Sequence, residues 1–271
     1  MAATQPRAQG VAAVGVAVSR GRSRLVRLRQ QGSAKCLLPG RPAHPDAVFL
    51  NTAGGITGGD RLCFTAEAGA GARLRVATQT AERAYRAVPG QVGRVETHLV
   101  LGAGARLDWL PQETILFEGC AVERWIEVEM AADATLLMAE AGILGRAAMG
   151  ERVTRGHYAE QWRVRRAGAL VFADALRLSG PVAEIAARPA LFGPNKAWAS
   201  ILYAAPDAED RLSEARELLG RMPEAVEAGA SAWNGLLALR MLAPGGKPLR
   251  AALMTVLAGL GRAALPRVWT M

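Results

Sequence analysis

The chain has 271 residues, of which 51% are hydrophobic and 21% are charged, a balance that excludes general disorder and allows a sizeable buried core. The formal net charge is +9, but the basic residues, nearly all arginine, are scattered rather than gathered with aromatic residues, which disfavours nucleic acid and favours an acidic protein as partner. No apolar stretch reaches the roughly 18 to 20 residues of a membrane span, and three widely spaced cysteines without a CxxC pair favour a reducing cytoplasm.

The first predicted element is a strand at residues 11–18, VAAVGVAV, because this run lacks the length and the cleavage site of a signal peptide. Alternating or β-branched runs separated by glycine turns predict further strands up to about residue 178. The clearest of these runs cover residues 61–67, 73–80, 94–101, 122–130 and 158–165.

A weak internal repeat runs through this β-rich part. A small-residue turn followed by alanine and an apolar run recurs at intervals of about 30 residues, as GARLRVAT from Gly71, GARLDWLP from Gly104, DATLLMAE from Asp133 and GALVFADA from Gly168. Three of the four follow a long alternating segment, so each unit is expected to be a long strand, a tight turn and a shorter strand. Units of this kind stack into a layered β structure.

The C-terminal third has a different pattern. Residues 207–222 carry apolar side chains at helical spacing on a charged segment, which predicts an amphipathic helix, and a second helix is expected at 248–264, with Pro266 as its stop. We therefore predict a mainly β fold, a β-helix-like stack of strands over residues 1–179, with a smaller α+β part containing about two helices over 180–271. The two parts are expected to pack as one globular unit.

The densest local signal is the glycine cluster GGITGGD, residues 54–60. A phosphate-binding loop would need GxxxxGK[ST] or GxGxxG between a strand and a helix. Here no lysine follows, and the next segment, RLCFTAE, is typical of a strand. We interpret the cluster as a tight turn between strands, in which Asp60 is held beside exposed backbone amides.

Metal ligation by histidine is not favoured by the sequence. His44, His98 and His157 are isolated, and none has the spacing that places two imidazoles on one metal, so a dedicated zinc site is not expected and each histidine is interpreted as structural.

Oxygen donors are better placed. Asp60, Glu113, Glu140 and Asp174 lie within or beside apolar strands, and carboxylates alone bind a divalent cation such as nickel weakly. Surface acids or acids in ion pairs remain the alternative interpretation.

Hydrolytic chemistry has little support, because the chain has neither GxSxG nor a cysteine and histidine pair at a recognisable spacing. Paired carboxylates, as in glycosidases, are brought together in space and leave no signature in sequence. A β-helical carbohydrate-active enzyme with a paired-carboxylate site therefore stays as the alternative, although aromatic residues for sugar binding make up only 5% of the chain. A basic nucleic-acid-binding module is a third interpretation, and it predicts strongly salt-dependent binding.

An ordered series of motifs is more specific than any of these single features. The motifs are FLNTAGGITGGDRL (49–62), ATQTAERAYR (77–86), LDWLPQETILFEG (107–119), LLMAEAGILGRAAMGE (136–151) and PRVW (266–269). This series resembles the UreD family of urease accessory proteins, called UreH in some organisms, over about residues 24–269.

The resemblance implies a non-enzymatic accessory protein that binds the apo-urease subunits and UreF, which in turn recruits the GTPase UreG carrying nickel. It also implies a β-helix-like fold, no tightly bound cofactor, and a water-filled passage in which nickel is held transiently. On this basis we predict that Asp60, Glu140 and Asp174, with Glu113 as a further member, line that passage. The C-terminal helix and the PRVW end are predicted to help form the UreF interface, with plain core packing as the alternative.

Overall fold

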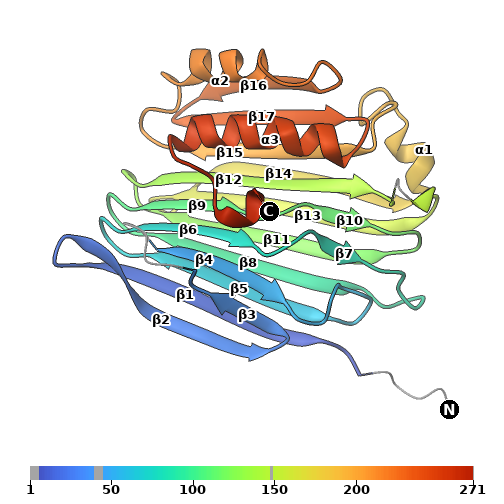
Figure 1. Ribbon diagram of the computed structural model, residues 1–271, viewed down its shortest axis with the longest axis horizontal. Coiled ribbons are helices and arrows are strands. Elements are labelled where there is room, and N and C mark those ends of the chain that lie inside the picture. Colours follow the sequence, from blue (N-terminus) through green and yellow to red (C-terminus); the bar gives the residue numbers. More distant parts are fainter. Residues whose placement is uncertain (1–5, 40–44, 147–148, 271) are drawn as a thin grey trace.

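The fold of the chain, seen in a computed structural model that describes residues 6–39, 45–146 and 149–270, is a stack of strands with a few helices at one end (Figure 1). The strands are β1 (Gln9–Ser19), β2 (Arg22–Gly32), β3 (Ala34–Leu37), β4 (Asp46–Asn51), β5 (Arg61–Ala68), β6 (Arg73–Thr78), β7 (Glu82–Ala84), β8 (Gly93–Leu101), β9 (Arg106–Leu110), β10 (Thr114–Leu116), β11 (Ala121–Met130), β12 (Thr135–Leu144), β13 (Gly156–Arg166), β14 (Ala169–Gly180), β15 (Ala197–Ala204), β16 (Glu227–Trp233) and β17 (Leu236–Ala243). The helices are α1 (Val182–Ala186), α2 (Leu212–Leu219), α3 (Gly246–Gly261) and a short 3-10 helix, Arg267–Trp269.

Two parallel sheets form the walls of the stack. One wall runs in the order β1, β5, β8, β11 and β13, and the other runs in the order β4, β6, β9 and β12. Short parallel pairings of β7 with β10 and of β10 with β12 close a third side. Each coil therefore contributes one strand to the first wall and, after a turn, one strand to the second wall. This arrangement confirms the predicted β-helix-like stack.

The first three repeat units lie in register in this stack. Leu74 pairs with Leu107, and Leu107 pairs with Leu136, so the same apolar position of each unit falls in one interior column. All three leucines are buried. The repeat exists because each coil has to cover the apolar side of the coil before it.

The fourth unit behaves differently. Instead of forming another coil, β14 folds back antiparallel on β13. The turn between them uses left-handed backbone at Ala167 (φ 49°) and Gly168 (φ 81°), a conformation typical of two-residue hairpins. The parallel coils therefore end at β13, and the interpretation of GALVFADA as a stacking unit was wrong.

Beyond this point the second wall continues with antiparallel strands. β12 pairs with β15, β15 with β17, and β17 with β16. The helices α2 and α3 occur where the apolar spacing predicts them, with α3 lying along this extension in Figure 1. The short helix α1 was not predicted. The sheet thus crosses the expected boundary at residue 180, and the division into 1–179 and 180–271 stays a prediction.

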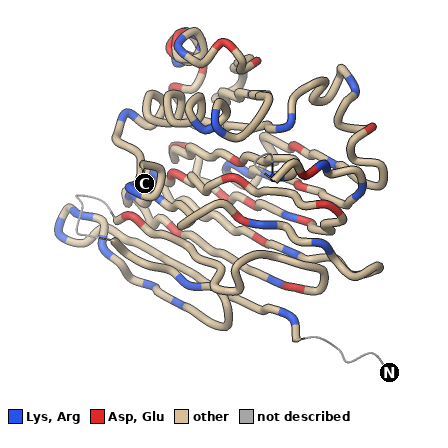
Figure 2. Tube along the Cα trace, turned by 45° about the vertical axis from the view of Figure 1, so that its right-hand side comes forward, with Lys and Arg blue, Asp and Glu red and all other residues tan. Residues whose placement is uncertain are grey.

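Two apolar clusters form the core. The larger cluster fills the space between the walls of the stack, and the smaller one lies between the antiparallel extension and α3. At the opposite end, β2 is an exposed strand with arginines along its length (Figure 2), a composition that discourages unwanted pairing at a sheet edge. None of the described helices is long and apolar enough to cross a membrane.

Candidate functional site

The most unusual feature of the interior is a charged cluster of Arg124, Glu140 and Glu160. Arg124 on β11 stands directly opposite Glu160 on the parallel neighbour β13, and their side chains meet at 3.0 Å. Glu140 reaches the same guanidinium from β12 on the other wall, at 2.8 Å. All three residues are buried, so the two walls of the stack are joined here by ion pairs inside the apolar core.

Neutral donors surround the two carboxylates. The indole nitrogen of Trp109 donates to Glu140 Oε1 at 2.9 Å, and the indole nitrogen of Trp162 donates to Glu160 Oε1 at 3.2 Å. The Tyr158 hydroxyl donates to Glu160 Oε2 at 2.7 Å. These contacts hold the carboxyl groups at fixed positions, as buried polar groups require.

The charges of the cluster do not balance, because two carboxylates face one guanidinium. Burial is the main reason that the pKa of Glu140 is raised to about 7; the charge of Glu160 raises it further, and Arg124 opposes both effects. Glu140 Oε2 lies 2.8 Å from an Arg124 guanidinium nitrogen, so the two carboxylates share one guanidinium. When both glutamates are ionised, one negative charge of the cluster is left for a proton or a cation to neutralise.

The cluster separates two cavities. The first cavity, of about 90 Å³, is lined by Arg124 together with polar groups that include Asn51, Glu82, Thr97 and Thr114. The second cavity, of about 300 Å³, is lined by Glu160 and by Asp174, Trp198, Ser200 and Arg240. Because Arg124 and Glu160 are in contact, the two cavities approach each other at the cluster.

Comparison with known proteins shows the family of this chain. Residues 8–270 match the family model for the UreD urease accessory protein. The chain belongs to the UreD family. It is 47% identical over 267 residues to the urease accessory protein UreD of Xanthobacter autotrophicus, an alignment that covers 98% of this chain and 91% of that protein. It is 50% identical over 253 residues to the UreD protein of Dinoroseobacter shibae, covering 93% and 88% of the two chains. The family confirms the resemblance found in the motifs and supports an accessory role in urease maturation.

The structure of this UreD-family chain places two of the four predicted acids in the charged cluster or in the lining of a cavity. Glu140 is part of the cluster, and Asp174 lines the second cavity, where it forms an ion pair with Arg240 at 2.6 Å.

The other two predicted acids have different surroundings. Asp60 accepts hydrogen bonds from the backbone amides of Ala8 and Thr57, both at 2.8 Å, which is the turn geometry expected for the glycine cluster. Glu113 lies 3.4 Å from Arg250. Among the residues described, neither acid belongs to the lining of the two cavities.

Sequence reasoning missed Arg124 and Glu160, although a signal was present. In VERWIEVEM, Arg124 has the same alternation phase as Val122 and Ile126, and in HYAEQWRVRR, Glu160 has the phase of Tyr158 and Trp162. A charged residue at the inward phase of a strand requires a buried partner. That they are each other's partner follows only from the register between β11 and β13.

The histidines were expected to be structural. His157 interacts with Ser179 and Glu123, both at 3.1 Å, as a structural histidine does. His44 lies outside the described residues. His98 lies on the outer face of the stack beside Cys63 and Glu96.

Proposed function

We propose that this UreD-family chain acts in urease maturation as a non-enzymatic scaffold that links apo-urease to UreF and the GTPase UreG, and that nickel crosses its interior on the way to the urease active site. Nickel is the cargo in this proposal and is held only in passing. The observation that carries the route is the cluster of Arg124, Glu140 and Glu160 between two cavities.

The charge imbalance of the cluster favours a mobile cation. With both glutamates ionised, one negative charge stays uncompensated in the low-dielectric interior, which is costly unless a proton or a cation neutralises it. A Glu140 pKa of about 7 allows a proton to occupy the site in the resting protein and to leave when a divalent cation arrives. Oxygen ligands hold a first-row divalent ion less tightly than imidazole or thiolate ligands do, so the ion is able to move on.

Carboxylates stand on both sides of the cluster. In the first cavity, Glu82 accepts a hydrogen bond from Asn51 at 3.2 Å, and burial raises the pKa of this glutamate. In the second cavity, Asp174 lies near the surface. We propose the order Glu82, Glu140 with Glu160, then Asp174. We assign Asp60 and Glu113 lesser parts on the route, because neither of them lines either cavity.

The same burial argues against the alternative of a carbohydrate-active enzyme. Such an enzyme needs two carboxyl groups across an open, substrate-wide groove. Glu140 and Glu160 are only 2% and 6% exposed, and both contact Arg124. A sugar ring does not fit between them.

We also propose the predicted UreF interface at the C-terminal end, but on fewer residues than the sequence suggests. The apolar side chains of α3, such as Leu253, and Trp269 of the PRVW end are buried in the smaller core cluster, and Trp269 donates a hydrogen bond to the Leu110 carbonyl at 3.0 Å. Core packing accounts for these residues. The surface available for UreF at this end is the outward side, which includes Lys247, Ala251 and Arg267.

Truncation before Gly245 would remove part of the core, so charge reversal at Lys247 and Arg267 is the better test of this interface. We expect the double change to lower UreF recovery in a pull-down without altering the stability of the chain. Unchanged recovery would refute the interface.

We also expect the protein to work in the cytoplasm, whose reducing conditions suit three free cysteines.

The route is tested by co-expressing the chain with its urease operon and replacing Glu140 by glutamine or Asp174 by asparagine. Each change removes an ionisable carboxyl group and keeps the size of the side chain. We expect both variants to retain UreF and apo-urease in pull-downs while urease activity falls. Glu129→Gln is the matched control, because Glu129 lies on β11, exposed, next to Arg165. Full urease activity with both variants would refute the nickel route. Failure of the unsubstituted chain to recover UreF and apo-urease in the pull-down would refute the scaffold.

A further inference from the structure

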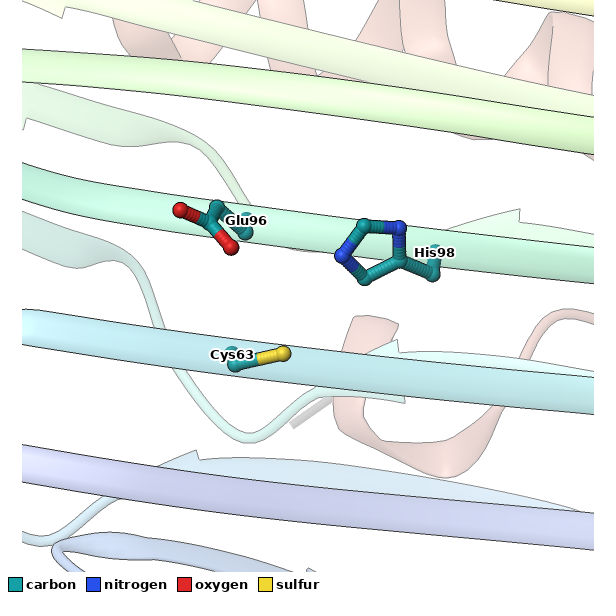
Figure 3. A group of neighbouring side chains, drawn as sticks. All are labelled: Cys63, Glu96 and His98. Atoms are coloured by element: carbon teal, nitrogen blue, oxygen red, sulfur yellow. The ribbon is translucent and has the colours of Figure 1, made fainter.

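A second group of possible metal ligands lies on the outer face of the stack, away from the interior cluster. Cys63 on β5 stands directly opposite Glu96 on the parallel neighbour β8, and His98 follows two residues later on the same side of β8. Their neighbours along these strands, Leu62, Val95 and Thr97, are buried and point into the core. Strand alternation therefore turns all three ligand side chains outward (Figure 3).

The three side chains are close enough to share one ion. A ligand atom from each, the Cys63 sulfur, a Glu96 oxygen and a His98 ring nitrogen, lies within 4.8 Å of the other two. Ligands bound tetrahedrally at zinc distances of about 2.0 to 2.3 Å are roughly 3.5 Å apart. Small rotations of these outward side chains are enough to close the difference, because Glu96 is exposed and His98 is half-buried.

The orientation of His98 fits a ligand. Its Nδ1 lies 3.8 Å from Glu127 Oε2 on β11, the next strand of the same wall, where Glu127 and His98 are paired in register. The other ring nitrogen faces Glu96 and Cys63 (Figure 3). This distance is longer than a hydrogen bond, so Glu127 has to move closer to orient the ring, as the carboxylates behind metal-bound histidines do.

The donor set indicates the class of ion. A thiolate and an imidazole favour borderline-soft divalent ions such as Zn²⁺ and Ni²⁺ over Mg²⁺ or Ca²⁺. Three protein ligands leave a fourth position for water or for a ligand from another protein, as in open zinc sites. The neighbouring surface is hollowed beside Cys63, Glu96 and Arg94, so this position is accessible.

We propose that Cys63, Glu96 and His98 form an open, three-ligand binding site for a borderline-soft divalent metal ion on the outer face of the stack, with Glu127 as the residue that positions His98. The site differs from the interior route in its ligands, because it contains a thiolate and an imidazole where the route offers carboxylates. It does not depend on the proposed passage of nickel. It also revises the sequence-based expectation that His98 is only structural.

The test is a titration of the purified chain with Co²⁺, Ni²⁺ and Zn²⁺. With Co²⁺ or Ni²⁺ we expect a thiolate-to-metal charge-transfer band that saturates at one ion per chain. Cys63→Ser removes this band, and His98→Gln weakens binding about tenfold or more. Glu127→Gln weakens binding by about tenfold, the cost typical of losing a group that orients a ligand. Zn²⁺ is expected to bind the same three ligands, to displace Co²⁺ or Ni²⁺ and so to abolish the band.

Two control variants separate this site from others. His157→Gln removes a histidine that also stands beside a carboxylate, Glu123, and it leaves the band unchanged. Glu140→Gln alters the interior cluster and also leaves the band unchanged. Absence of a thiolate band in the unsubstituted chain, or a band that survives Cys63→Ser, would overturn the proposal. Circular dichroism of each variant shows that the fold is retained.

Discussion

Replacing Glu140 by glutamine should change how the stability of the protein depends on pH. In the folded chain the pKa of Glu140 is about 7, against an ordinary value of 4.5, chiefly because the group is buried. Between these values the unfolded chain releases the proton of Glu140 and the folded chain keeps it. Folding stability from this group is therefore fully present below about pH 4.5 and is lost as the pH rises to about 7.

The size of the effect follows from the pKa difference. At about 1.4 kcal/mol for each pKa unit, the change from 4.5 to about 7 corresponds to about 3 to 4 kcal/mol in the free energy of unfolding. Glutamine does not titrate, so Glu140→Gln lacks this contribution. Other groups with shifted pKa values, such as Glu118 and Glu151, whose pKa values are lowered, are present in both proteins and cancel in the comparison.

Urea unfolding of both proteins from pH 4.5 to pH 7.5 measures this difference. We expect the stability of the unsubstituted chain relative to Glu140→Gln to fall by about 3 kcal/mol across the range. The m-value should stay constant, which shows that the same surface is exposed on unfolding. A relative stability that is flat to within about 0.5 kcal/mol would refute the account of the cluster as an under-neutralised site.

Three further predictions concern the same scaffold and are checked by urea unfolding at neutral pH. Arg124→Met leaves the two glutamates without a counter-charge and should cost about 3 to 5 kcal/mol; a smaller loss than about 1 kcal/mol would contradict the ion-pair geometry. Gly142→Ala puts a methyl group into the indole ring of Trp198 and should cost about 1 to 3 kcal/mol, whereas no loss would mean that this contact is looser than described. Ala167→Gly relieves left-handed backbone in the hairpin after β13 and should stabilise the chain by up to about 1 kcal/mol, and a destabilisation would argue against that turn.

The sequence predicts the stack of coils well, because the apolar pattern that produces the stack lies within single strands. The repeated leucines, represented by Leu74 and Leu107, mark the inward side of consecutive coils, and a buried side has to be covered by the next coil. The same pattern does not show where the coils stop. GALVFADA resembles the earlier units, but the left-handed backbone at Ala167 and Gly168 reverses the chain, and an alanine carries little signal for that conformation.

The candidate site was only partly predictable, because its contacts join strands that are distant in sequence. Glu140 was identified as an acid within an apolar strand. Its partners Arg124 and Glu160 come from two other strands, and their meeting depends on the parallel register of the coils. The outer group has the same origin, since Cys63 and His98 approach each other only when β5 and β8 pair. The sequence shows the type of each residue and the face of the strand on which it lies, but it does not show the register in which two strands pair.

The most direct test of the proposed nickel route is the nickel content of urease matured with Glu140→Gln. Urease is purified after co-expression with the unsubstituted chain, with Glu140→Gln or with the control Glu129→Gln, and its bound nickel is measured by atomic spectrometry. We expect the control to match the unsubstituted chain, and Glu140→Gln to yield urease with much less nickel although the complex with UreF and apo-urease still forms. Urease fully loaded with nickel in the presence of Glu140→Gln would contradict the route through the buried cluster.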